Sequence, residues 1–390
     1  MQDRLISLVQ ALEDCRGFLA SCATAPRVFP RTPLGEQPFA ALERSLAALS
    51  EALALPPFAR CARRPADVNS LDLALSRYLA IGADLAWPDP AQVPALVAQW
   101  RRSAPRPAVR TVAASSGGQL RVETWAAPAL PRQAPVVLLL PICGLPLVAL
   151  RPLMRELAQD HTVLGWESSL LAGMDPLPAA VGDPVTMMAR DVADVVSACQ
   201  LGQVHLVAIC AATAPGLAAA HMLGPQVQSL SICHAAVRVG EQALATPFEQ
   251  DYNAMLRAVC DSEEQARAVH GTLLEPGFAM SVPAALAPFI LDPYTNLSRL
   301  RRHARVHGAA TAYDARAIAG QIDCATLMLA TRNDRMVHPE QSRRLAALMP
   351  NASLHAFDDG EHLDVLLAGN AFLPRIASFI AQHTPLLTEG

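Results

Sequence analysis

The chain has 390 residues, of which 52% are hydrophobic and 17% charged, so it can bury a sizeable core and is not disordered. Its formal net charge of -4 is small for this length and indicates no basic surface for nucleic acid or an anionic membrane. All 31 basic residues are arginine, which excludes Walker-type phosphate loops, pyridoxal Schiff bases and lysine nucleophiles, because each needs the lysine amine.

Residues 1–104 have the spacing of amphipathic helices. Apolar residues recur three and four positions apart in LISLVQAL, ALERSLAALSEALAL and LDLALSRYLAIGADL, and proline-rich links separate these stretches. We therefore expect a helical N-terminal region over residues 1–104, followed by a second domain over residues 105–390. The acidic residues in the first helix, and the lack of a basic start before an apolar run, argue against a signal peptide.

Alternation of apolar and polar residues takes over between Pro105 and Pro131. The stretches AVRTVAAS and QLRVETWA flank Gly117 and Gly118, and this pattern predicts a β-hairpin. The next stretch, residues 134–150, carries no charge, but two prolines and a glycine interrupt it. It predicts a buried strand, a turn and a helix, and not a membrane span.

Strands and helices alternate after the hairpin, which predicts a mostly parallel sheet with helices on both faces. Residues 240–320 break the alternation and predict a helical lid inserted over one edge of the sheet. The predicted strands cover residues 136–140, 162–167, 204–209, 227–235, 324–331 and 353–357, and the predicted helices cover 147–159, 185–200, 211–223, 339–348 and 362–382.

A cysteine stands at the corner between a predicted strand and a predicted helix in VHLVAICAATAPG. In a nucleophile elbow, small residues flank the reactive side chain so that strand and helix can pass closely, and here Ala208 and Ala212 flank Cys210. The alternative is a small buried cysteine that ends a core strand, which the motif alone would favour.

Two later residues favour the elbow. Asp334 lies in the loop after the strand CATLMLAT, and His362 opens the predicted last helix after the strand ASLHAF. The order nucleophile, acid, histidine is the order of an α/β-hydrolase. Three other acids compete with Asp334 but lie in a less favourable position beside His362, namely Asp358, Asp359 and Asp364.

From about residue 107 onward the chain resembles the α/β-hydrolase family with a cysteine nucleophile. It is most similar to the aminoacyltransferases that move aminoacyl groups between carrier proteins in nonribosomal peptide pathways, such as those for syringomycin and coronamic acid. The polyhydroxyalkanoate synthases, which also have a helical N-terminal part and a thiol at the elbow, are a more distant resemblance. Two departures are the alanines beside Cys210 and the turn PICGLP where hydrolases often have His-Gly.

The resemblance implies a role for each matched position. Cys210 attacks an acyl thioester, His362 takes and returns a proton, and Asp334 orients the imidazole. The backbone N–H groups of Ala211 and Ile142 form the oxyanion hole. No metal or redox cofactor is expected; the substrate is carried on the phosphopantetheine of a partner protein, and a reducing cytoplasm fits the nine cysteines, which have no zinc spacing.

Thiol chemistry favours a transferase. Exchanging one thioester for another is close to isoenergetic, whereas a serine would trap the acyl group as a more stable oxyester. We expect a cysteine-dependent acyltransferase acting between carrier-bound phosphopantetheine thiols. The alternatives are a thioesterase, a synthase that polymerises hydroxyacyl thioesters, and a catalytically silent binding scaffold.

Several other residues have weaker interpretations. The histidines at 205, 234 and 338 are expected to be packing or surface residues, and Cys143 is expected to be structural. Glu167 could meet a substrate ammonium if its loop borders the pocket. A cluster of arginines within the lid could dock an acidic carrier protein, although a solvated helix face is at least as good an interpretation; it comprises Arg299, Arg301, Arg302, Arg305 and Arg316.

Overall fold

The computed structural model describes residues 2–30, 34–58, 61, 68–81, 87–131, 134–172, 182–240 and 244–385. The chain forms two compact units. One unit comprises Met1–Arg106 and Ser262–Leu300, and the other comprises Pro107–Asp261 and Arg301–Gly390. The predicted lid over residues 240–320 is therefore divided between the two units.

The first unit is helical, as the spacing predicts, and in α3 the buried apolar residues recur three and four positions apart, from Phe39 to Leu53. Helix α4 shows how local sequence defines an element: Asn69 and Asp72 form a capping box at its start, and Ala80 ends it in a left-handed conformation with φ 52°. The helices are α1 (Gln2–Asp14), α2 (Arg16–Ser21), α3 (Glu36–Leu53), α4 (Ser70–Leu79), α5 (Val93–Ser103), α11 (Glu263–Leu273), α12 (Pro276–Met280) and α13 (Ala287–Ile290).

Residues 262–300 are joined to the N-terminal helices through α4, which packs on α12 and α13. The Ser70 hydroxyl donates to the Leu273 carbonyl oxygen at 2.6 Å, and Arg77 Nη1 donates to the Val282 carbonyl oxygen at 2.9 Å. This part of the insertion therefore completes the helical unit.

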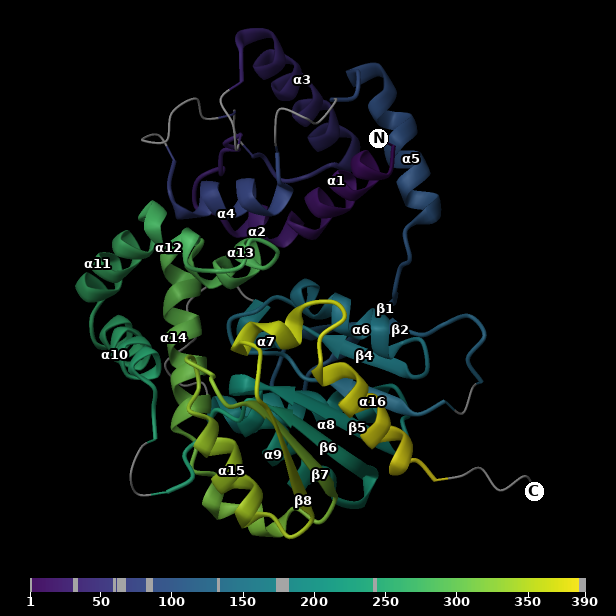
Figure 1. Cartoon of the computed structure of the whole chain (residues 1–390), viewed down its shortest axis with the longest axis vertical. Coiled ribbons are helices and arrows are strands. Elements are labelled where there is room, and N and C mark those ends of the chain that lie inside the picture. The colour runs from purple at the N-terminus through teal and green to yellow at the C-terminus, as the bar shows by residue number, and fades with distance from the viewer. Residues whose placement is uncertain are drawn as a thin grey trace. The chain divides into compact units, whose positions relative to one another are not determined.

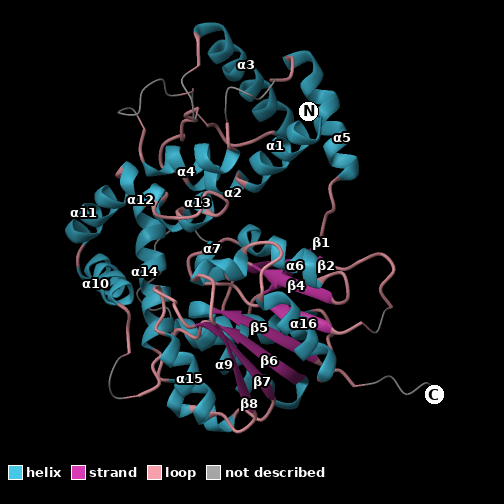
Figure 2. Ribbon diagram, in the orientation of Figure 1, coloured by secondary structure: helices cyan, strands magenta, loops and turns pink. Residues whose placement is uncertain are grey.

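The second unit is built on an eight-stranded sheet with the order β1-β2-β4-β3-β5-β6-β7-β8 (Figure 2). The first two strands pair antiparallel, β2 pairs antiparallel with β4, and all later pairs are parallel. The strands are β1 (Ala108–Ala113), β2 (Gln119–Trp125), β3 (Val136–Leu139), β4 (Thr162–Trp166), β5 (Val204–Ile209), β6 (Val227–Cys233), β7 (Ala325–Thr331) and β8 (Ala352–Phe357).

Helices cover both faces of this sheet, which confirms the predicted α/β architecture. Figure 1 shows α16 in front of the strands and α8 and α9 behind them; α8 packs on α9, and α16 packs on α6. The described helices of the second unit are α6 (Arg151–Leu157), α7 (Ser169–Ala172), α8 (Pro184–Ala198), α9 (Thr213–Leu223), α10 (Pro247–Asp261), α15 (Pro339–Leu348) and α16 (Phe372–Gln382), together with α14 (Leu297–Ala312) from Arg301 onward.

The predicted helix over residues 362–382 is wrong in its first half. A 3₁₀ turn, η9 (His362–Leu366), is followed by a turn in which Gly369 has φ 67°, and α16 begins only at Phe372. The Asn370 side chain stabilises this break, because Oδ1 accepts from the N–H groups of Phe372 and Leu373, both at 3.0 Å. The break places His362 on a short turn of its own.

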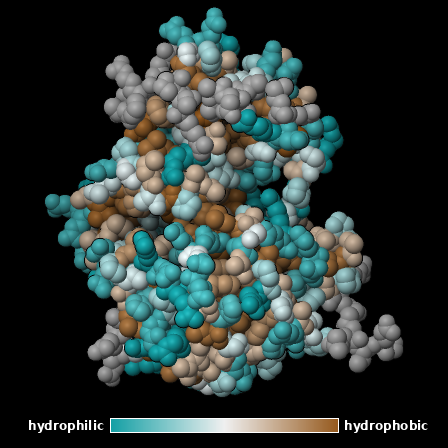
Figure 3. All heavy atoms as spheres, in the orientation of Figure 1, coloured by the Kyte–Doolittle hydropathy of each residue, from teal (hydrophilic) through white to brown (hydrophobic). Residues whose placement is uncertain are grey.

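None of the described helices is both long enough and apolar enough to cross a bilayer. The uncharged stretch that begins before β3 forms that strand, a turn and the 3₁₀ segment η3 (Leu147–Leu150). On the face shown in Figure 3, polar and apolar side chains are interspersed over the second unit.

Candidate active site

Cys210 occupies a strained backbone conformation directly after the central strand β5. Its φ is 54°, in the left-handed region that a side chain with a Cβ seldom adopts, and its side chain is half-buried. The Thr213 hydroxyl donates to the Cys210 carbonyl oxygen at 2.7 Å and holds the corner at the start of α9. The geometry is that of a nucleophile elbow, with the thiol at the carboxyl edge of the sheet.

The close approach of strand and helix depends on Gly216 as well as on the alanines expected at this corner. Ala208 and Ala212 are fully buried. A Cβ placed on Gly216 would lie 3.0 Å from the Ala208 Cβ, which is tighter than ordinary packing. Glycine is thus present at Gly216, one helical turn beyond the flanking residue Ala212.

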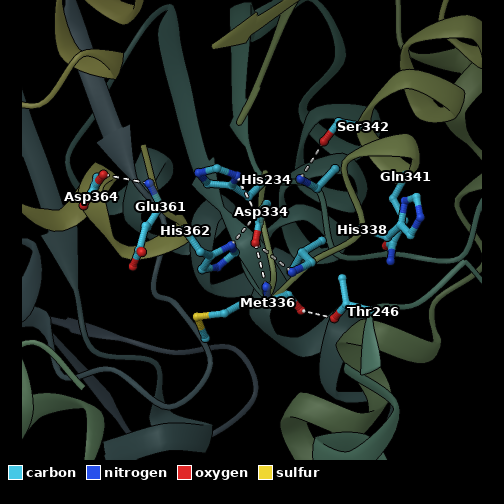
Figure 4. Close-up of polar contacts among 12 residues, drawn as sticks. His234, Thr246, Asp334, Met336, His338, Gln341, Ser342, Glu361, His362 and Asp364 are labelled. Atoms are coloured by element: carbon cyan, nitrogen blue, oxygen red, sulfur yellow. Dashed lines mark hydrogen bonds and ion pairs between the residues drawn. The ribbon is translucent and has the colours of Figure 1, made fainter. Parts of the chain in front are cut away.

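Asp334 lies in the loop after β7 and is bonded through both carboxylate oxygens (Figure 4). Oδ1 accepts from the N–H groups of Met336 at 2.8 Å and Val337 at 3.0 Å, and Oδ2 lies 2.7 Å from His362 Nδ1. The structure therefore brings together the predicted acid and the predicted histidine, which are far apart in the sequence.

The three competing acids lie elsewhere. Asp364 accepts from the Glu361 N–H at 2.7 Å and caps η9, as Figure 4 also shows. Asp358 pairs with Arg332 at 2.7 Å with 82% of its side chain exposed, and Asp359 is exposed. None of these contacts the His362 imidazole.

His362 is buried, and its Nδ1 lies 2.7 Å from Asp334 Oδ2. Burial alone would lower the pKa of His362, but its interactions with the negative charges of Cys210 and Asp334 raise it to about 10. The protonated imidazole is thus favoured when it faces a Cys210 thiolate, which is the ion pair that a thiol nucleophile needs.

The Asp334 carboxylate is held in its charged form. Burial by itself would raise its pKa, but hydrogen bonds from His234 and His362 outweigh burial and hold the pKa of Asp334 well below its usual range. An anion therefore stays beside His362 through the whole physiological pH range.

His234 is a residue of this site that sequence reasoning missed. It directly follows β6, has φ 54° and is 1% exposed. Its Nδ1 lies 2.9 Å from Asp334 Oδ2, and its ring lies 4.6 Å from the His362 ring between centroids. The available signal was its position: His234 follows β6 as Cys210 follows the neighbouring strand β5, and both strands end at the same sheet edge.

The same three side chains have the spacing of a metal site. Within the described part of the chain, ligand atoms of His234, Asp334 and His362 all lie within 4.8 Å of one another. The His362 Nδ1 forms a hydrogen bond with the same carboxylate oxygen that lies 2.9 Å from His234 Nδ1, so both rings turn a nitrogen toward the carboxylate.

The expected oxyanion donors lie at the start of the elbow helix and in the turn after β3. The Ala211 N–H belongs to the 3₁₀ turn η4 (Cys210–Ala212), and the Ile142 N–H lies in the turn between β3 and η3. Gly144 shapes the second turn, with φ 88°. A Cβ there would lie 2.5 Å from the ring of His303, which bonds the Tyr252 hydroxyl at 2.7 Å.

Cys143, beside Ile142, is buried, and burial together with the charge of Cys210 raises the pKa of its thiol to about 12. All nine cysteines are free. Burial also raises the thiol pKa of six more, so these are poor sources of thiolate at neutral pH: Cys15, Cys22, Cys61, Cys233, Cys260 and Cys324.

Two of the remaining histidines have structural roles, as expected. His205 is buried within β5 with Nδ1 2.8 Å from the Ser229 hydroxyl, and burial lowers its pKa to about 4. His338 caps α15, because its Nδ1 accepts from the Glu340 N–H at 3.2 Å. Glu167 lies half-buried between β4 and α7, and no hydrogen bond is described for it within the described ranges.

Two arginines of the expected docking patch are engaged within the protein. Arg302 is 8% exposed and donates to the Leu170 carbonyl oxygen at 2.9 Å, and Arg299 forms an ion pair with Asp292. Both guanidinium groups are held by the protein itself, because helix periodicity turns these positions inward. Arg301 and Arg305 are partly exposed, and Arg316 pairs with Asp314 at 2.6 Å.

A cavity of about 470 Å³ opens between α10 and α14 in the second unit. Glu249 and Gln341 line it and also tie it to the acid loop: Gln341 Nε2 donates to Glu249 Oε1 at 2.8 Å, and Glu249 Oε2 accepts from the His338 N–H at 3.1 Å. Cys210 is not among the residues that line it.

No protein-family model matches the sequence, and no curated protein matches it. Solved structures do match. A bacterial membrane phospholipase A aligns with a TM-score of 0.56 at 15% identity, over 75% of this chain and 92% of that protein. An esterase from a Rhodococcus species aligns with a TM-score of 0.56 at 17% identity, over 71% of this chain and 99% of that one.

An enol-lactonase from Burkholderia xenovorans gives a TM-score of 0.51 at 18% identity, over 71% of this chain and 100% of the lactonase. Identities this low show a shared fold and leave activity open. Together with the strand order and the elbow after β5, these similarities show that the chain has the α/β-hydrolase fold.

Proposed function

We propose that this α/β-hydrolase-fold protein is an acyltransferase that carries an acyl or aminoacyl group on Cys210 between two thiols. The observation that carries the proposal is the convergence of three side chains: Cys210 stands at a left-handed elbow, its charge acts on His362, and His362 is hydrogen-bonded to Asp334. A thiolate paired with an imidazolium attacks thioesters without prior deprotonation by another base.

In the first half-reaction the Cys210 sulfur attacks the carbonyl carbon of a donor thioester. Negative charge develops on the carbonyl oxygen, where the N–H groups of Ala211 and Ile142 would stabilise it. The carbon–sulfur bond to the donor then breaks, and His362 gives its proton to the departing thiolate. An acyl thioester on Cys210 and a neutral imidazole remain.

In the second half-reaction His362 removes the proton from an acceptor thiol, whose sulfur attacks the acyl-Cys210 carbonyl. Cys210 leaves as the thiolate beside the reprotonated imidazole, and the site is restored. Asp334 keeps the imidazole oriented and stabilises its charged form in both halves. Each half exchanges one thioester for another, so the transfer potential of the acyl group is retained.

The partners in this proposal are carrier proteins that present the acyl group on phosphopantetheine, and the finer resemblance to aminoacyltransferases of nonribosomal peptide pathways suggests aminoacyl groups. Arg299 and Arg302, held by Asp292 and by a backbone carbonyl, are poor docking residues for them. The competing function is hydrolysis, since the similar solved structures include an esterase and a phospholipase.

Intact-protein mass spectrometry with acyl and aminoacyl pantetheine thioesters tests the proposal. We expect a stable acyl adduct that is absent in Cys210→Ala, present in the matched variant Cys260→Ala, and lost when a free pantetheine thiol is added. In Cys210→Ser an oxyester should accumulate and resist transfer. Release of the acid to water without transfer would establish a thioesterase, and no adduct with any donor would favour a binding scaffold.

A further inference from the structure

Two imidazoles meet a single carboxylate oxygen at the edge of the sheet (Figure 4). The Nδ1 atoms of His362 and His234 lie 2.7 Å and 2.9 Å from Asp334 Oδ2. We propose that His234 is a positioning residue: its Nδ1–H donates to Asp334, fixes the carboxylate beneath His362 and keeps it charged. This inference rests on the proposed roles of Asp334 and His362.

The backbone around His234 is fixed from both sides. Its N–H donates to the Leu329 carbonyl oxygen of β7 at 2.8 Å, and the next N–H, that of Ala235, donates to the Ser342 hydroxyl at 3.0 Å. Because φ is 54°, the chain turns sharply after β6 and directs the side chain along the sheet edge toward the β7 loop.

The ring of His234 is also fixed by packing. It lies between the ring of His362, at 4.6 Å, and the ring of Phe372 on α16, at 5.0 Å between centroids. It is 1% exposed, so rotation away from Asp334 would need a cavity that close packing does not provide. The ring therefore holds Nδ1 beside the carboxylate.

A neutral imidazole suits this role. Burial, aided by the His362 charge, lowers the pKa of His234 against the opposing effects of Asp334 and Asp364. A neutral ring carries one N–H, and of the two ring nitrogens Nδ1 is the one that lies near an acceptor, 2.9 Å from Asp334 Oδ2, although in this structure neither nitrogen meets strict hydrogen-bond geometry. His234 therefore adds a hydrogen bond to Asp334 without adding a second positive charge.

With His234, Asp334 would have four donors. Two backbone N–H groups bind Oδ1, the His362 imidazole binds Oδ2, and His234 Nδ1 lies 2.9 Å from the same oxygen. Removing one donor to a carboxylate disfavours its charged form, so loss of His234 should raise the pKa of Asp334. The other acidic groups that act on this cluster are Glu249 on α10 and Asp364 on η9, and both remain in the variants below.

Two substitutions separate donation from packing. His234→Phe keeps an aromatic ring against His362 and Phe372 but has no donor. His234→Asn places an amide N–H near the position of Nδ1, and asparagine tolerates the left-handed backbone. Circular dichroism checks that each variant is folded.

The readout is the rate at which iodoacetamide alkylates Cys210, measured between pH 4 and pH 8. Peptide mass mapping identifies and quantifies the alkylated cysteine. This measurement needs no acyl substrate, so it judges His234 even if no acyl transfer is found. We expect His234→Phe to slow alkylation roughly 10- to 100-fold near neutral pH, as for other outer hydrogen-bond partners. Its rate should also begin to fall at a higher pH than that of the wild type, and His234→Asn should restore the wild-type profile.

A folded His234→Phe variant with the wild-type pH profile, or with the same loss at every pH, would overturn the inference, because packing alone would then suffice. If His234→Phe does not fold, ¹⁵N NMR of histidine-labelled wild-type protein decides. We expect the Nδ1–H tautomer of His234, and an Nε2–H tautomer would overturn the inference.

Discussion

At the scale of single residues, the charge on Asp334 controls the imidazole beside it. In Asp334→Asn both the acceptor and the negative charge that raise the pKa of His362 are lost, so that pKa should fall. We expect acyl transfer to fall on the order of 10⁴-fold, as when the orienting acid of a catalytic triad is replaced. NMR titration of labelled histidine and kcat measure the two effects, and Asp358→Asn, an exposed matched control, should change neither.

The same substitution changes how stability depends on pH. The pKa of Asp334 is lower in the folded chain than in the unfolded chain, so its contribution is present above the unfolded value and is lost as pH falls toward the folded one. Wild type should lose this stability as pH falls below about 4, the ordinary aspartate range, whereas Asp334→Asn should not. Equal slopes in acid denaturation would contradict the assigned pairing.

The pairing of His362 with Asp334 could be predicted from sequence because both residues follow strands that a recognisable pattern defines. The second imidazole could not, since a lone histidine after a buried strand gives no periodic signal. Its contact depends on the left-handed turn at His234 and on the register of β6 with β7. Both are properties of the folded sheet.

At the scale of elements, the Asn370 side chain links η9, which carries His362, to the start of α16. Asn370 accepts from the first N–H groups of α16 and donates to the Leu367 carbonyl oxygen at 2.8 Å. Asn370→Ala should destabilise the fold by about 1–2 kcal/mol, the usual cost of losing a cap. Activity should fall as well, because Phe372 packs on His234.

Thermal unfolding and kcat measure these two effects of Asn370→Ala. Asn351→Ala is the matched control. The exposed Asn351 side chain donates to the Asp323 carbonyl oxygen and caps no helix. A variant that is as stable as the wild type would show that Asn370 does not act as a cap.

The central strands were predictable to within a few residues because each is a short buried apolar run between turn residues, as in β5, where all six residues are buried. The interruption at residues 367–371 was not, because the apolar spacing of a helix continues across Gly369 and Asn370. A capping side chain overrode that periodicity, and its bonds are visible only in three dimensions.

At the scale of the whole molecule, residues 262–300 depend on α4 for their support. Arg77 donates to two carbonyl oxygens of this segment, those of Val282 and Ala279. In Arg77→Ala we expect faster amide hydrogen exchange over residues 276–283, because these carbonyls lose a charged donor. Arg101→Ala, which removes a bond to the Ala52 carbonyl oxygen, should leave that segment unchanged.

Unchanged exchange over residues 276–283 in Arg77→Ala would mean that other contacts hold the segment to α4. The sequence predicts one lid over residues 240–320 because the whole segment has a helix-like pattern. Residues 262–300, the central part of this segment, pack on α4, about two hundred positions earlier in the chain. Composition and periodicity do not encode such long-range contacts.

Cys210 and His234 both have φ 54°, at the ends of adjacent parallel strands. Neither residue favours this left-handed conformation in an unfolded chain, because the conformation costs about 1–3 kcal/mol at each position. The backbone conformations of Cys210 and His234 therefore depend on the same event, the pairing of β5 with β6. An unfolded chain has neither the elbow at Cys210 nor the contact of His234 with Asp334, so the proposed site exists only in the folded sheet.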